Sequence, residues 1–423
     1  MGETVPPPWY RPRGYRHFDP LVDWHVALNC VSEPKRVISH SFLPLLSYAK
    51  QIPRYDPNLH KVVTKDRQIA YASHMDAQIF AYYAHLLADP YEKELRRENL
   101  SDCVIAYRSI DRKSNIEFAA EVFAAIENMG NCVALGLDIT GFFDHINHAV
   151  LKQLWSYLLM QNTTTLPLDH YKVFKALTKY AHVNRDRAYN AFGLTFSDDQ
   201  DNRKPLCTPQ QFGEIIRGGG LIKVNTESYG IPQGTPVSAI ASNISMLPFD
   251  RIALELATEV GGLYRRYSDD IFFLSPPNLA SYVELSLTNA LHPLGLEFKS
   301  KKTERTEFEV GVSGVRIKSG RPFPYLGFVF DGKRRLIRSS SLSRYYQKTK
   351  KKIRMAKIAA ARAAATGTPA KPFRRLIYQQ TTHLGQKRTF LRYAYRADKI
   401  MPGGSIRRQI KPHWKRVKRL LDE

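Results

Sequence analysis

The alternation of hydrophobic and polar positions divides the chain into short apolar strands and longer amphipathic helices. Residues 132–138 form a compact apolar run that ends on an acid, which predicts a buried strand with Asp138 at its C-terminal end. Residues 262–274 contain two aromatic and aliphatic runs separated by two adjacent acids. This pattern predicts a strand, a tight turn with Asp269 and Asp270 at its tip, and a second strand.

Helical periodicity dominates the remainder of the chain. A helix is expected to begin near Ser73, where Asp76 occupies the position of a capping-box acid. Further helices are expected at 118–129, 141–158, 239–259, 280–292 and 342–365. Strands are also expected at 104–108, 309–317 and 325–330. The pattern at 1–60 predicts an irregular, partly helical extension, and the pattern at 163–228 predicts helices joined by exposed loops. Together these patterns predict an α+β protein.

The charge of the chain is concentrated at its C-terminal end. The net charge is +24, and residues 331–423 contain 27 Lys and Arg against 4 acids, a net charge of +23. Residues 1–330 are therefore close to neutral, at +1. A nearly neutral body with a strongly basic segment is typical of a protein that binds a polyanion such as a nucleic acid. The length of 423 residues allows two or three domains or one multi-lobed enzyme.

Other features of the composition exclude several classes of protein. The four cysteines are scattered without a CxxC spacing, which predicts reduced thiols and argues against a zinc site or a disulfide framework. No apolar stretch reaches the ~18 residues of a membrane span, so no membrane partner is expected. The N-terminus is acidic and rich in proline, unlike a signal peptide. The sequence therefore predicts a cytoplasmic protein.

Three carboxylates from separate elements suggest a metal site. Asp138 ends one predicted strand, and Asp269 and Asp270 form the tip of a predicted hairpin. Like charges that lie close together are costly, and a divalent cation removes that cost. Three such acids suit two Mg²⁺ ions, which prefer oxygen ligands and phosphate co-ligands. A loop rich in glycine and proline at 230–238 opens a helix, where backbone can approach a nucleotide. For the Asp269-Asp270 pair alone, a solvated surface turn is the alternative.

These residues, in this order, resemble the motifs of bacterial reverse transcriptases, the group that includes retron, group II intron and phage-defence enzymes. The resemblance is carried by Asp138-Ile-Thr-Gly-Phe-Phe-Asp144, Gly230-Ile-Pro-Gln-Gly-Thr-Pro-Val-Ser-Ala239, Tyr267-Ser-Asp-Asp270, Gly295-Leu-Glu-Phe-Lys-Ser-Lys-Lys-Thr303 and Tyr325-Leu-Gly-Phe328. It implies a right-hand polymerase fold with fingers, a palm of antiparallel sheet and helices, and a basic helical thumb. The implied domains are an N-terminal extension at 1–60, fingers at 61–131, a palm at 132–335 with an insertion at about 163–228, and a thumb and RNA-binding region at 336–423.

The resemblance also implies roles for the acids. Asp138 and Asp269 would hold two Mg²⁺ ions, with Mn²⁺ as a possible substitute, and Asp270 would add charge or an outer contact. The carbonyl of Ile139 would complete the ligands. The implied reaction is in-line attack of a primer hydroxyl on a dNTP with release of pyrophosphate.

Residues that contact the nucleotide are implied in the same way. Phe143 would crowd the sugar 2′ position, Gln233 and Gly234 would position the template and the incoming base, and Lys302 would protonate the leaving pyrophosphate. The candidates to grip the triphosphate are Arg108, Arg112 and Lys113. The alternatives are a core aromatic for Phe143, a surface lysine for Lys302 and a solvated basic turn for the other three.

Contacts to the nucleic acid are expected in two places. The turn Tyr325-Leu326-Gly327 resembles a primer grip. On the predicted C-terminal helix, the cations expected to follow a phosphate backbone are Lys348, Lys351, Lys352 and Arg354. A solvated helix face is the alternative for these cations.

The implied function is RNA-directed DNA synthesis on a structured non-coding RNA partner, from dNTPs to a DNA product, in anti-phage defence inside a bacterium. The chain is most similar to the class 2 type of stand-alone defence-associated reverse transcriptase. It departs from retron enzymes because Asn289-Ala-Leu-His292 and Val312-Ser-Gly314 lie at other positions than the retron elements, and Lys299 stands where an Asn is customary. The alternatives are a retron-type enzyme making branched RNA-DNA, a template-independent polymerase, and a catalytically inactive RNA-binding protein.

Overall fold

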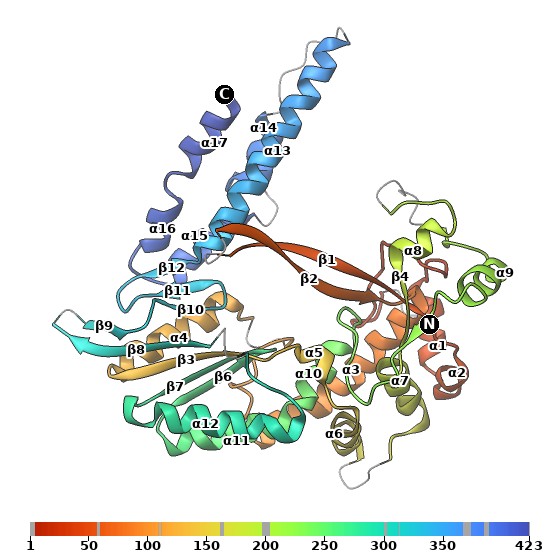
Figure 1. Ribbon diagram of the computed structural model, residues 1–423, viewed down its shortest axis with the longest axis horizontal. Helices are drawn as coiled ribbons and strands as arrows, with labels where there is room; N and C mark the ends of the chain where they lie inside the picture. Colours follow the sequence, from red (N-terminus) through yellow and green to blue (C-terminus); the bar gives the residue numbers. More distant parts are fainter. Residues whose placement is uncertain are drawn as a thin grey trace. The chain divides into compact units, whose positions relative to one another are not determined.

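The computed structural model is an α+β protein, as the sequence predicts (Figure 1). It describes residues 5–56, 60–108, 110, 112–160, 165–196, 204–299, 303–312, 314–366, 374–384 and 389–422. The chain forms two compact units from alternating segments. The first unit comprises Met1–Tyr107, Ile139–Leu254 and Ser286–Phe298, and the second comprises Arg108–Asp138, Glu255–Leu285 and Lys299–Glu423. The division into fingers, palm and thumb stays a prediction.

A long antiparallel hairpin is the main strand element of the first unit. Its strands are β1 (Leu45–Asp56) and β2 (Lys61–Tyr71), and the sheet has the order β2-β1-β4-β5 with β4 (Ala181–Asn184) and β5 (Lys223–Val224). The expectation that 1–60 is irregular is therefore wrong for β1. This strand carries charged residues and Pro53 instead of an alternating apolar pattern, and its pairing with β2 stabilises it.

Helices make up most of the first unit. They are α1 (Trp24–Val31), α2 (Pro34–Ser39), α3 (His74–Arg97), α5 (Phe142–His145), α6 (His148–Met160), α7 (Leu168–Thr178), α8 (Arg185–Asn190), α9 (Pro209–Gln211), η1 (Phe212–Arg217), α10 (Ser238–Ser245) and η3 (His292–Leu294). The predicted start of α3 is confirmed, because the Ser73 side chain accepts a hydrogen bond from the Asp76 N–H. The Asp76 carboxylate does not complete a capping box. It instead contacts His40 Nε2 at 2.6 Å and accepts from the Leu43 N–H at 2.9 Å.

Several predictions of regular structure are corrected. The helix expected at 141–158 is divided into α5 and α6. The strand expected at 309–317 covers parts of two strands, β8 (Glu304–Gly311) and β9 (Gly314–Ser319), and the one expected at 325–330 covers the end of β10 (Phe323–Tyr325) and all of β11 (Phe328–Phe330).

The single helix expected at 239–259 is two helices, α10 and α11 (Leu247–Glu259), separated at Met246. Pro248 has no N–H to continue the hydrogen-bond ladder of α10, which explains the break. The strand expected at 104–108 is reduced to a single β-bridge residue, Val104, followed by a turn at 106–107. Tyr107 has a φ of +61°, outside the extended region that a strand requires.

The second unit is built on two antiparallel sheets. The five-stranded sheet has the order β6-β7-β3-β8-β9, with β3 (Cys132–Asp138), β6 (Leu263–Tyr267), β7 (Asp270–Ser275), β8 (Glu304–Gly311) and β9 (Gly314–Ser319). The three-stranded sheet consists of β10 (Phe323–Tyr325), β11 (Phe328–Phe330) and β12 (Arg335–Ile337). The predicted buried strand at 132–138 and the predicted acidic hairpin are both confirmed.

Helices complete the second unit, and three of them share a buried core with the strands of both sheets. They are α4 (Asn115–Met129), η2 (Pro277–Leu279), α12 (Ala280–Leu291), α13 (Ser339–Ala365), α14 (Arg374–Thr381), α15 (Phe390–Ile400), α16 (Ser405–Ile410) and α17 (His413–Asp422). Ser114 and Glu117 form a capping box at the start of α4. Phe123 of α4 and Phe272 of β7 belong to one buried cluster that also contains Leu391 of α15.

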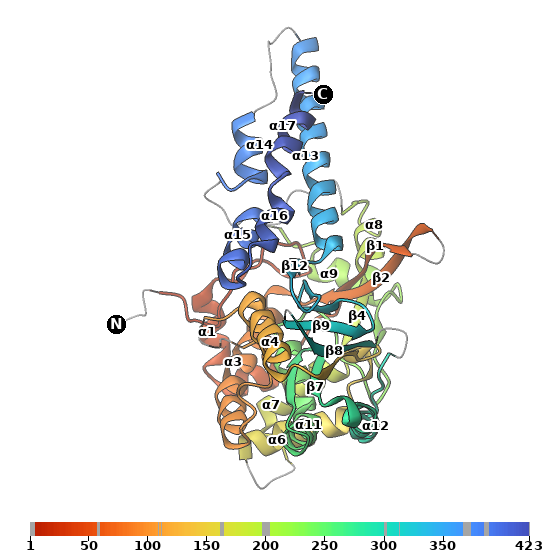
Figure 2. The ribbon, with the colours of Figure 1, turned by 90° about the vertical axis from the view of Figure 1, so that its left-hand side faces the viewer.

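The basic C-terminal segment folds as a small helical assembly. The predicted helix at 342–365 is confirmed, and α13 begins three residues earlier. Figure 2 shows α13, α14 and α17 side by side, and a buried cluster of Ile353, Ile377, Val417 and Leu421 joins them. Tyr378 and Trp414 stack with ring centroids 5.0 Å apart. Across the described residues, no helix is both long enough and apolar enough to cross a membrane.

Candidate functional site

Two of the predicted acids lie opposite each other at the ends of two neighbouring strands of the five-stranded sheet. Asp138 is the last residue of β3 and Asp270 the first of β7, and the strand register places them directly opposite each other. Tyr267 of β6 pairs with Asp270 from the other side. Residues directly opposed in an antiparallel pair have Cβ atoms about 4.5–5.5 Å apart and side chains on the same face of the sheet. The fold therefore brings together two acids that are distant in sequence, with Asp138 half-buried and Asp270 exposed.

A buried arginine supports the turn that carries Asp269. Ser268 has a φ of +61°, a left-handed conformation that a tight turn between strands requires. The Arg266 side chain is fully buried, at 0% exposure, and its Nη1 donates a hydrogen bond to the Ser268 carbonyl at 3.2 Å. Sequence reasoning missed this residue. The period-two alternation of β6, which places Arg266 on the same buried face as Tyr264, was the signal available for it.

The donor chemistry at these strand ends fits a hard divalent cation. Carboxylate oxygens are the ligands that Mg²⁺ prefers, and Mg²⁺ sites commonly use one or two carboxylates together with substrate phosphates. In the part of the chain that the structure describes, no group of three or more His, Cys, Asp or Glu side chains is arranged to hold a metal ion. Asp138 and Asp269 could therefore supply part of a ligand set, with the remainder coming from the substrate. Ile139, the other implied ligand, belongs to the first unit and is buried there.

A separate pocket in the first unit gathers three of the predicted nucleotide contacts. It has a volume of about 310 Å³ and is lined mainly by residues of β1, β2, the loop at 233–235 and the start of α10. Phe143, Gln233 and Gly234 all line it, and the Phe143 side chain is 7% exposed. The structure therefore places the implied sugar-crowding residue beside the implied base-positioning residues. Their roles stay predictions.

Backbone contacts hold the glycine of this pocket against β2. The Gln233 carbonyl accepts a hydrogen bond from the Ala70 N–H at 2.8 Å. Gly234 has a φ of +124°, and a Cβ atom added to it would lie 2.4 Å from the Ala70 carbonyl oxygen. Only glycine fits this close approach without movement of the backbone.

Two cations of the hairpin line the same pocket and were missed from the sequence. Lys50 of β1 and Arg67 of β2 are exposed and directly opposite each other in the strand register. The Arg67 Nε also donates a hydrogen bond to the Gln233 Oε1 at 2.8 Å. Like charges directly opposed across two strands are destabilising, and an anion between them removes that cost. Because β1 was not expected as a strand, no sequence signal connected these two residues.

The cations predicted to grip the triphosphate lie elsewhere. Arg108, Arg112 and Lys113 belong to the second unit and do not line the pocket. Arg108 is half-buried, Arg112 is exposed, and Lys113 Nζ lies 2.7 Å from the Glu121 carboxylate. Their role in nucleotide binding stays a prediction. Lys302 lies outside the described residues.

The predicted primer-grip turn is the loop of the β10–β11 hairpin. Leu326 has a φ of +43° and Gly327 a φ of +92°, and the Leu326 carbonyl accepts from Asn115 Nδ2 at 3.0 Å. Tyr325 is buried against Phe272, with ring centroids 5.4 Å apart, and burial raises the pKa of its hydroxyl. The nearby Asp270 charge adds to this increase in pKa, and the Arg265 charge opposes it. Tyr325 therefore acts as a core side chain, and a contact of this turn with nucleic acid stays a prediction.

The predicted backbone-binding cations of α13 lie on two sides of the helix. Lys348, Lys351, Lys352 and Arg354 are all exposed, whereas Thr349 and Ile353 between them are buried. Lys348 and Lys352 line a cavity of about 410 Å³ within the C-terminal helices, and Lys351 and Arg354 do not. The helix thus separates cations that border a cavity from cations on an open surface.

No protein-family model matches the chain. Among solved structures, it is similar to apo telomerase from Candida Tropicalis truncated from its C-terminal domain, with 12% sequence identity and a TM-score of 0.42, covering 73% of this chain and 58% of that chain. It is also similar to telomerase from Candida albicans in complex with a TWJ fragment of telomeric RNA, with 13% identity and a TM-score of 0.42, covering 74% of this chain and 49% of that chain. The chain thus spans 49–58% of the length of these two structures. At these values the similarity establishes neither a family nor an activity.

Proposed function

We propose that this protein is an RNA-directed DNA polymerase that extends a primer with dNTPs. The observation that carries the proposal is the strand register that sets Asp138 directly opposite Asp270, at the start of the hairpin strand that follows Asp269. A carboxylate set of this kind, drawn from two separate strands, is suited to two-metal phosphoryl transfer. The order of the sequence motifs and the Gln233–Gly234 pocket support the same function.

Each part of the chain has a distinct task in this reaction. Asp138 and Asp269 would hold the metal ions, and Asp270 would add negative charge beside them. Bound Mg²⁺, or Mn²⁺, would supply Lewis-acid chemistry, lowering the pKa of the primer hydroxyl and offsetting the charge of the triphosphate. Gln233 and Gly234 would position the base pair, and Phe143 would crowd the sugar 2′ position.

The triphosphate has a second set of candidate partners in the hairpin cations. Lys50 and Arg67 line the pocket that also contains Phe143 and Gln233, and both carry charge that an anion would offset. Arg67 can donate two parallel hydrogen bonds to phosphate oxygens, whereas Lys50 acts as a point charge. We therefore add these two residues to Arg108, Arg112 and Lys113 as candidates.

The template in this proposal is a structured non-coding RNA, and the process is anti-phage defence in a bacterial cytoplasm. The net charge of +23 in residues 331–423 supports a polyanionic partner. The resemblance of the motifs to stand-alone defence-associated enzymes supports the biological setting. Sequencing RNA that copurifies with the protein would identify the template, and a structured RNA encoded beside the gene is the expected result.

The first test is primer extension with labelled dNTPs on an RNA template. We expect Asp138→Ala to abolish incorporation while RNA binding changes by less than about twofold, because the acid acts on the reacting phosphate and not on template affinity. The matched control is Asp89→Ala, which removes an acid that is 68% exposed and paired with an exposed lysine, Lys93. Normal extension by Asp138→Ala would refute the metal assignment.

The same assay separates the alternatives. Sequencing the product distinguishes templated from untemplated synthesis, and a 2′–5′ branch in the product would identify retron-type priming. Absence of incorporation by the unmodified protein, with RNA still bound, would favour a catalytically inactive RNA-binding protein.

A further inference from the structure

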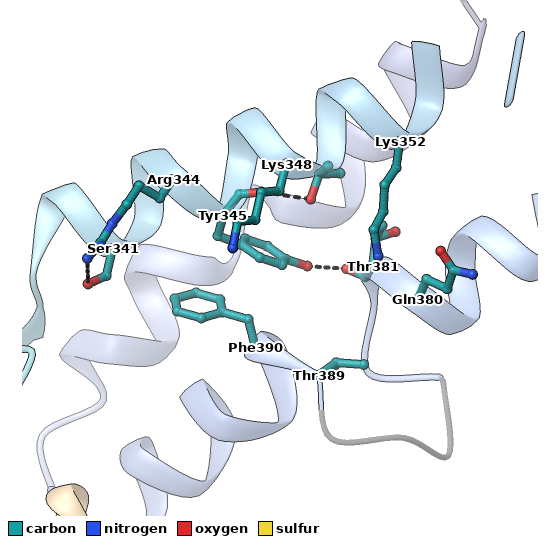
Figure 3. Close-up of a pocket in the computed structure, with 10 residues that line it drawn as sticks. Ser341, Arg344, Tyr345, Lys348, Lys352, Gln380, Thr381, Thr389 and Phe390 are labelled. Carbon is teal, nitrogen blue, oxygen red and sulfur yellow. Dashed lines mark hydrogen bonds between the residues drawn. The ribbon is translucent and has the colours of Figure 1, made fainter. Parts of the chain in front are cut away.

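The C-terminal helices enclose a cavity that has no assigned role. Its volume is about 410 Å³, within the range of small-molecule and nucleotide pockets, roughly 300–1,000 Å³. It is lined by residues of α13, the end of α14 and the start of α15, all in the second unit (Figure 3). We call it the α13–α15 pocket.

One wall of the pocket is a row of cations. Arg344, Lys348 and Lys352 lie on α13 at intervals of four residues and all line the pocket. Four residues of an α-helix advance by about 6 Å, so the row extends over roughly 12 Å. A single inorganic phosphate cannot contact both ends of such a row. The spacing instead suits several phosphates connected in a chain.

Among the residues that the structure describes, no acid neutralises these cations. Within the described residues, Lys348 and Lys352 form no ion pair, and Arg344 donates only to the Ser340 carbonyl and the Ser341 hydroxyl. No acidic residue is among those that line the pocket. The pocket therefore has an uncompensated positive charge that favours an anionic ligand.

The pocket also has an aromatic surface and an amide, with Tyr345 from α13, Phe390 from α15 and Gln380 from α14. Tyr345 and Phe390 stack with ring centroids 4.5 Å apart, and Tyr345 is fixed because its hydroxyl donates to the Thr381 carbonyl. Both rings are half-buried and border the pocket, as Figure 3 shows. Gln380 also lines it, and its side-chain amide makes no hydrogen bond to any described residue. An aromatic surface beside an amide provides both stacking and hydrogen bonding for a nucleic-acid base.

We propose that the α13–α15 pocket binds one unpaired nucleotide of a single-stranded polynucleotide whose phosphates follow Arg344, Lys348 and Lys352. The base enters towards Phe390 and Gln380, and the neighbouring phosphates lie along α13. A paired base would be stacked within a helix and unable to reach these side chains. This inference rests on the proposed function for the presence of nucleic acid and adds the kind of segment that the C-terminal region recognises.

The test measures binding of labelled oligonucleotides to the full-length protein by fluorescence anisotropy. The probes are a single-stranded RNA, a DNA of the same sequence, an RNA duplex of the same length, and a fully abasic single strand of the same length. The triple variant Arg344→Ala/Lys348→Ala/Lys352→Ala should weaken single-strand binding at least tenfold. It should also reduce the slope of log affinity against log salt concentration by about 2, since each lost contact contributes ~0.7.

A matched variant removes the same charge from the same helix. Lys350→Ala/Lys357→Ala/Arg362→Ala also deletes three cations of α13, none of which lines the pocket. We expect it to weaken single-strand binding by less than threefold. Equal losses in the two triple variants would overturn the pocket in favour of diffuse electrostatic attraction.

A second substitution tests the base instead of the phosphates. Phe390→Leu keeps an apolar side chain at the start of α15 but removes the ring, and it should weaken binding to the intact single strand by ~tenfold. Binding to the abasic strand should then be unchanged by Phe390→Leu. Equal losses for intact and abasic strands, or for the duplex and the single strand, would overturn the proposal. A greater loss for RNA than for DNA identifies a template segment as the ligand, and the reverse identifies the product.

Binding and synthesis are measured separately, so the two proposals can fail separately. If the unmodified protein incorporates no dNTP but the pocket variants still lose single-strand binding, the polymerase assignment fails and the pocket stands. If synthesis is normal and single-strand binding is unaffected in all variants, the pocket fails and the polymerase assignment stands.

Discussion

The two candidate sites are each built on a β-hairpin, but one hairpin carries acids above a buried arginine and the other carries exposed cations. The acidic β6–β7 hairpin is short, and Arg266 lies fully buried beneath its turn. The basic β1–β2 hairpin is longer, and its opposed pair of Lys50 and Arg67 is exposed on the strands. The acidic hairpin pairs with the buried strand β3, whereas most of the described side chains at 49–53 and 61–68 of the basic hairpin are exposed.

This difference shows how each hairpin is suited to its proposed ligand. A metal site requires carboxylates held in a fixed position, because Mg²⁺ demands near-ideal geometry. Burial of β7 and the hydrogen bond from Arg266 to the Ser268 carbonyl provide that rigidity. A triphosphate arrives and leaves in every cycle, and long exposed side chains can release it. The following predictions test this contrast, beginning with the largest expected effect.

Substitution of the turn acid should have the largest effect. We expect Asp269→Asn to reduce primer extension by at least ~10³-fold, since loss of a metal ligand removes several kcal/mol of transition-state stabilisation. Mg²⁺ titrations of the extension rate are the measurement. A rate that recovers fully at high Mg²⁺ would show that Asp269 affects metal affinity alone.

Substitution of the pocket glycine should have the next largest effect. Gly234→Ala places a Cβ atom 2.4 Å from the Ala70 carbonyl oxygen, so the loop must move and nucleotide positioning is lost. A displacement of ~1 Å can reduce kcat by ~100-fold. Gly193→Ala is the control, because Gly193 has a φ of +68° but no atom within 4 Å of the added Cβ. Equal kcat values for the two variants would contradict the role assigned to this close contact.

Loss of a hairpin cation should affect substrate affinity more than turnover. Arg67→Ala should raise the KM for dNTPs by ~tenfold or more, since a hydrogen bond to a charged group contributes about 1.5–3 kcal/mol. Lys61→Ala removes an exposed cation from the same strand outside the pocket and should leave KM unchanged. Steady-state kinetics with each dNTP provide the comparison, and a lower kcat at constant KM would count against a grip on the triphosphate.

The free energy of unfolding should fall in acid because of a buried histidine at the base of the β1–β2 hairpin. Burial lowers the pKa of His17 to about 3, with a contribution from His74, and its ring contacts Tyr71 at the end of β2. Its neutral form stabilises the fold fully above about pH 6.5, and that contribution is lost as the pH falls towards 3. We expect His17→Gln to reduce the pH dependence of the unfolding free energy by about 1.4 kcal/mol per pH unit below 6.5. Denaturant titrations at a series of pH values below 6.5 are the measurement. An unchanged slope in His17→Gln would contradict this prediction.

The smallest effect is expected from metal binding by the opposed acids. Asp138 and Asp270 face each other across β3 and β7, so Mg²⁺ should stabilise the fold through them, and Asp270→Asn should reduce that stabilisation by about 0.2–1 kcal/mol. Thermal unfolding with and without Mg²⁺ is the measurement. An equal stabilisation by Mg²⁺ in the unmodified protein and in Asp270→Asn would contradict this role of Asp270.

The sequence by itself determined the elements whose signals are local. The apolar run of β3, the acidic hairpin, the N-cap of α3 and the course of α13 all follow from periodicity and capping within one segment. The same signals predicted Asp138, Asp269 and Asp270 as acids at strand ends. They also predicted that the basic segment is helical and that the protein is α+β.

Only the tertiary structure decided which of these residues meet. The register of β3 against β7, the pairing of Lys50 with Arg67 and the burial of Arg266 depend on strand neighbours that no local pattern specifies. The α13–α15 pocket likewise combines Arg344 with Phe390, which are far apart in the chain. Periodicity assigns a residue to a face of its own element, but long-range packing selects the element that faces it. The acids, and the cations Lys348 and Lys352, could therefore be predicted from sequence, whereas the pairing of Lys50 with Arg67 and the meeting of α13 with Phe390 could be assigned only from the fold.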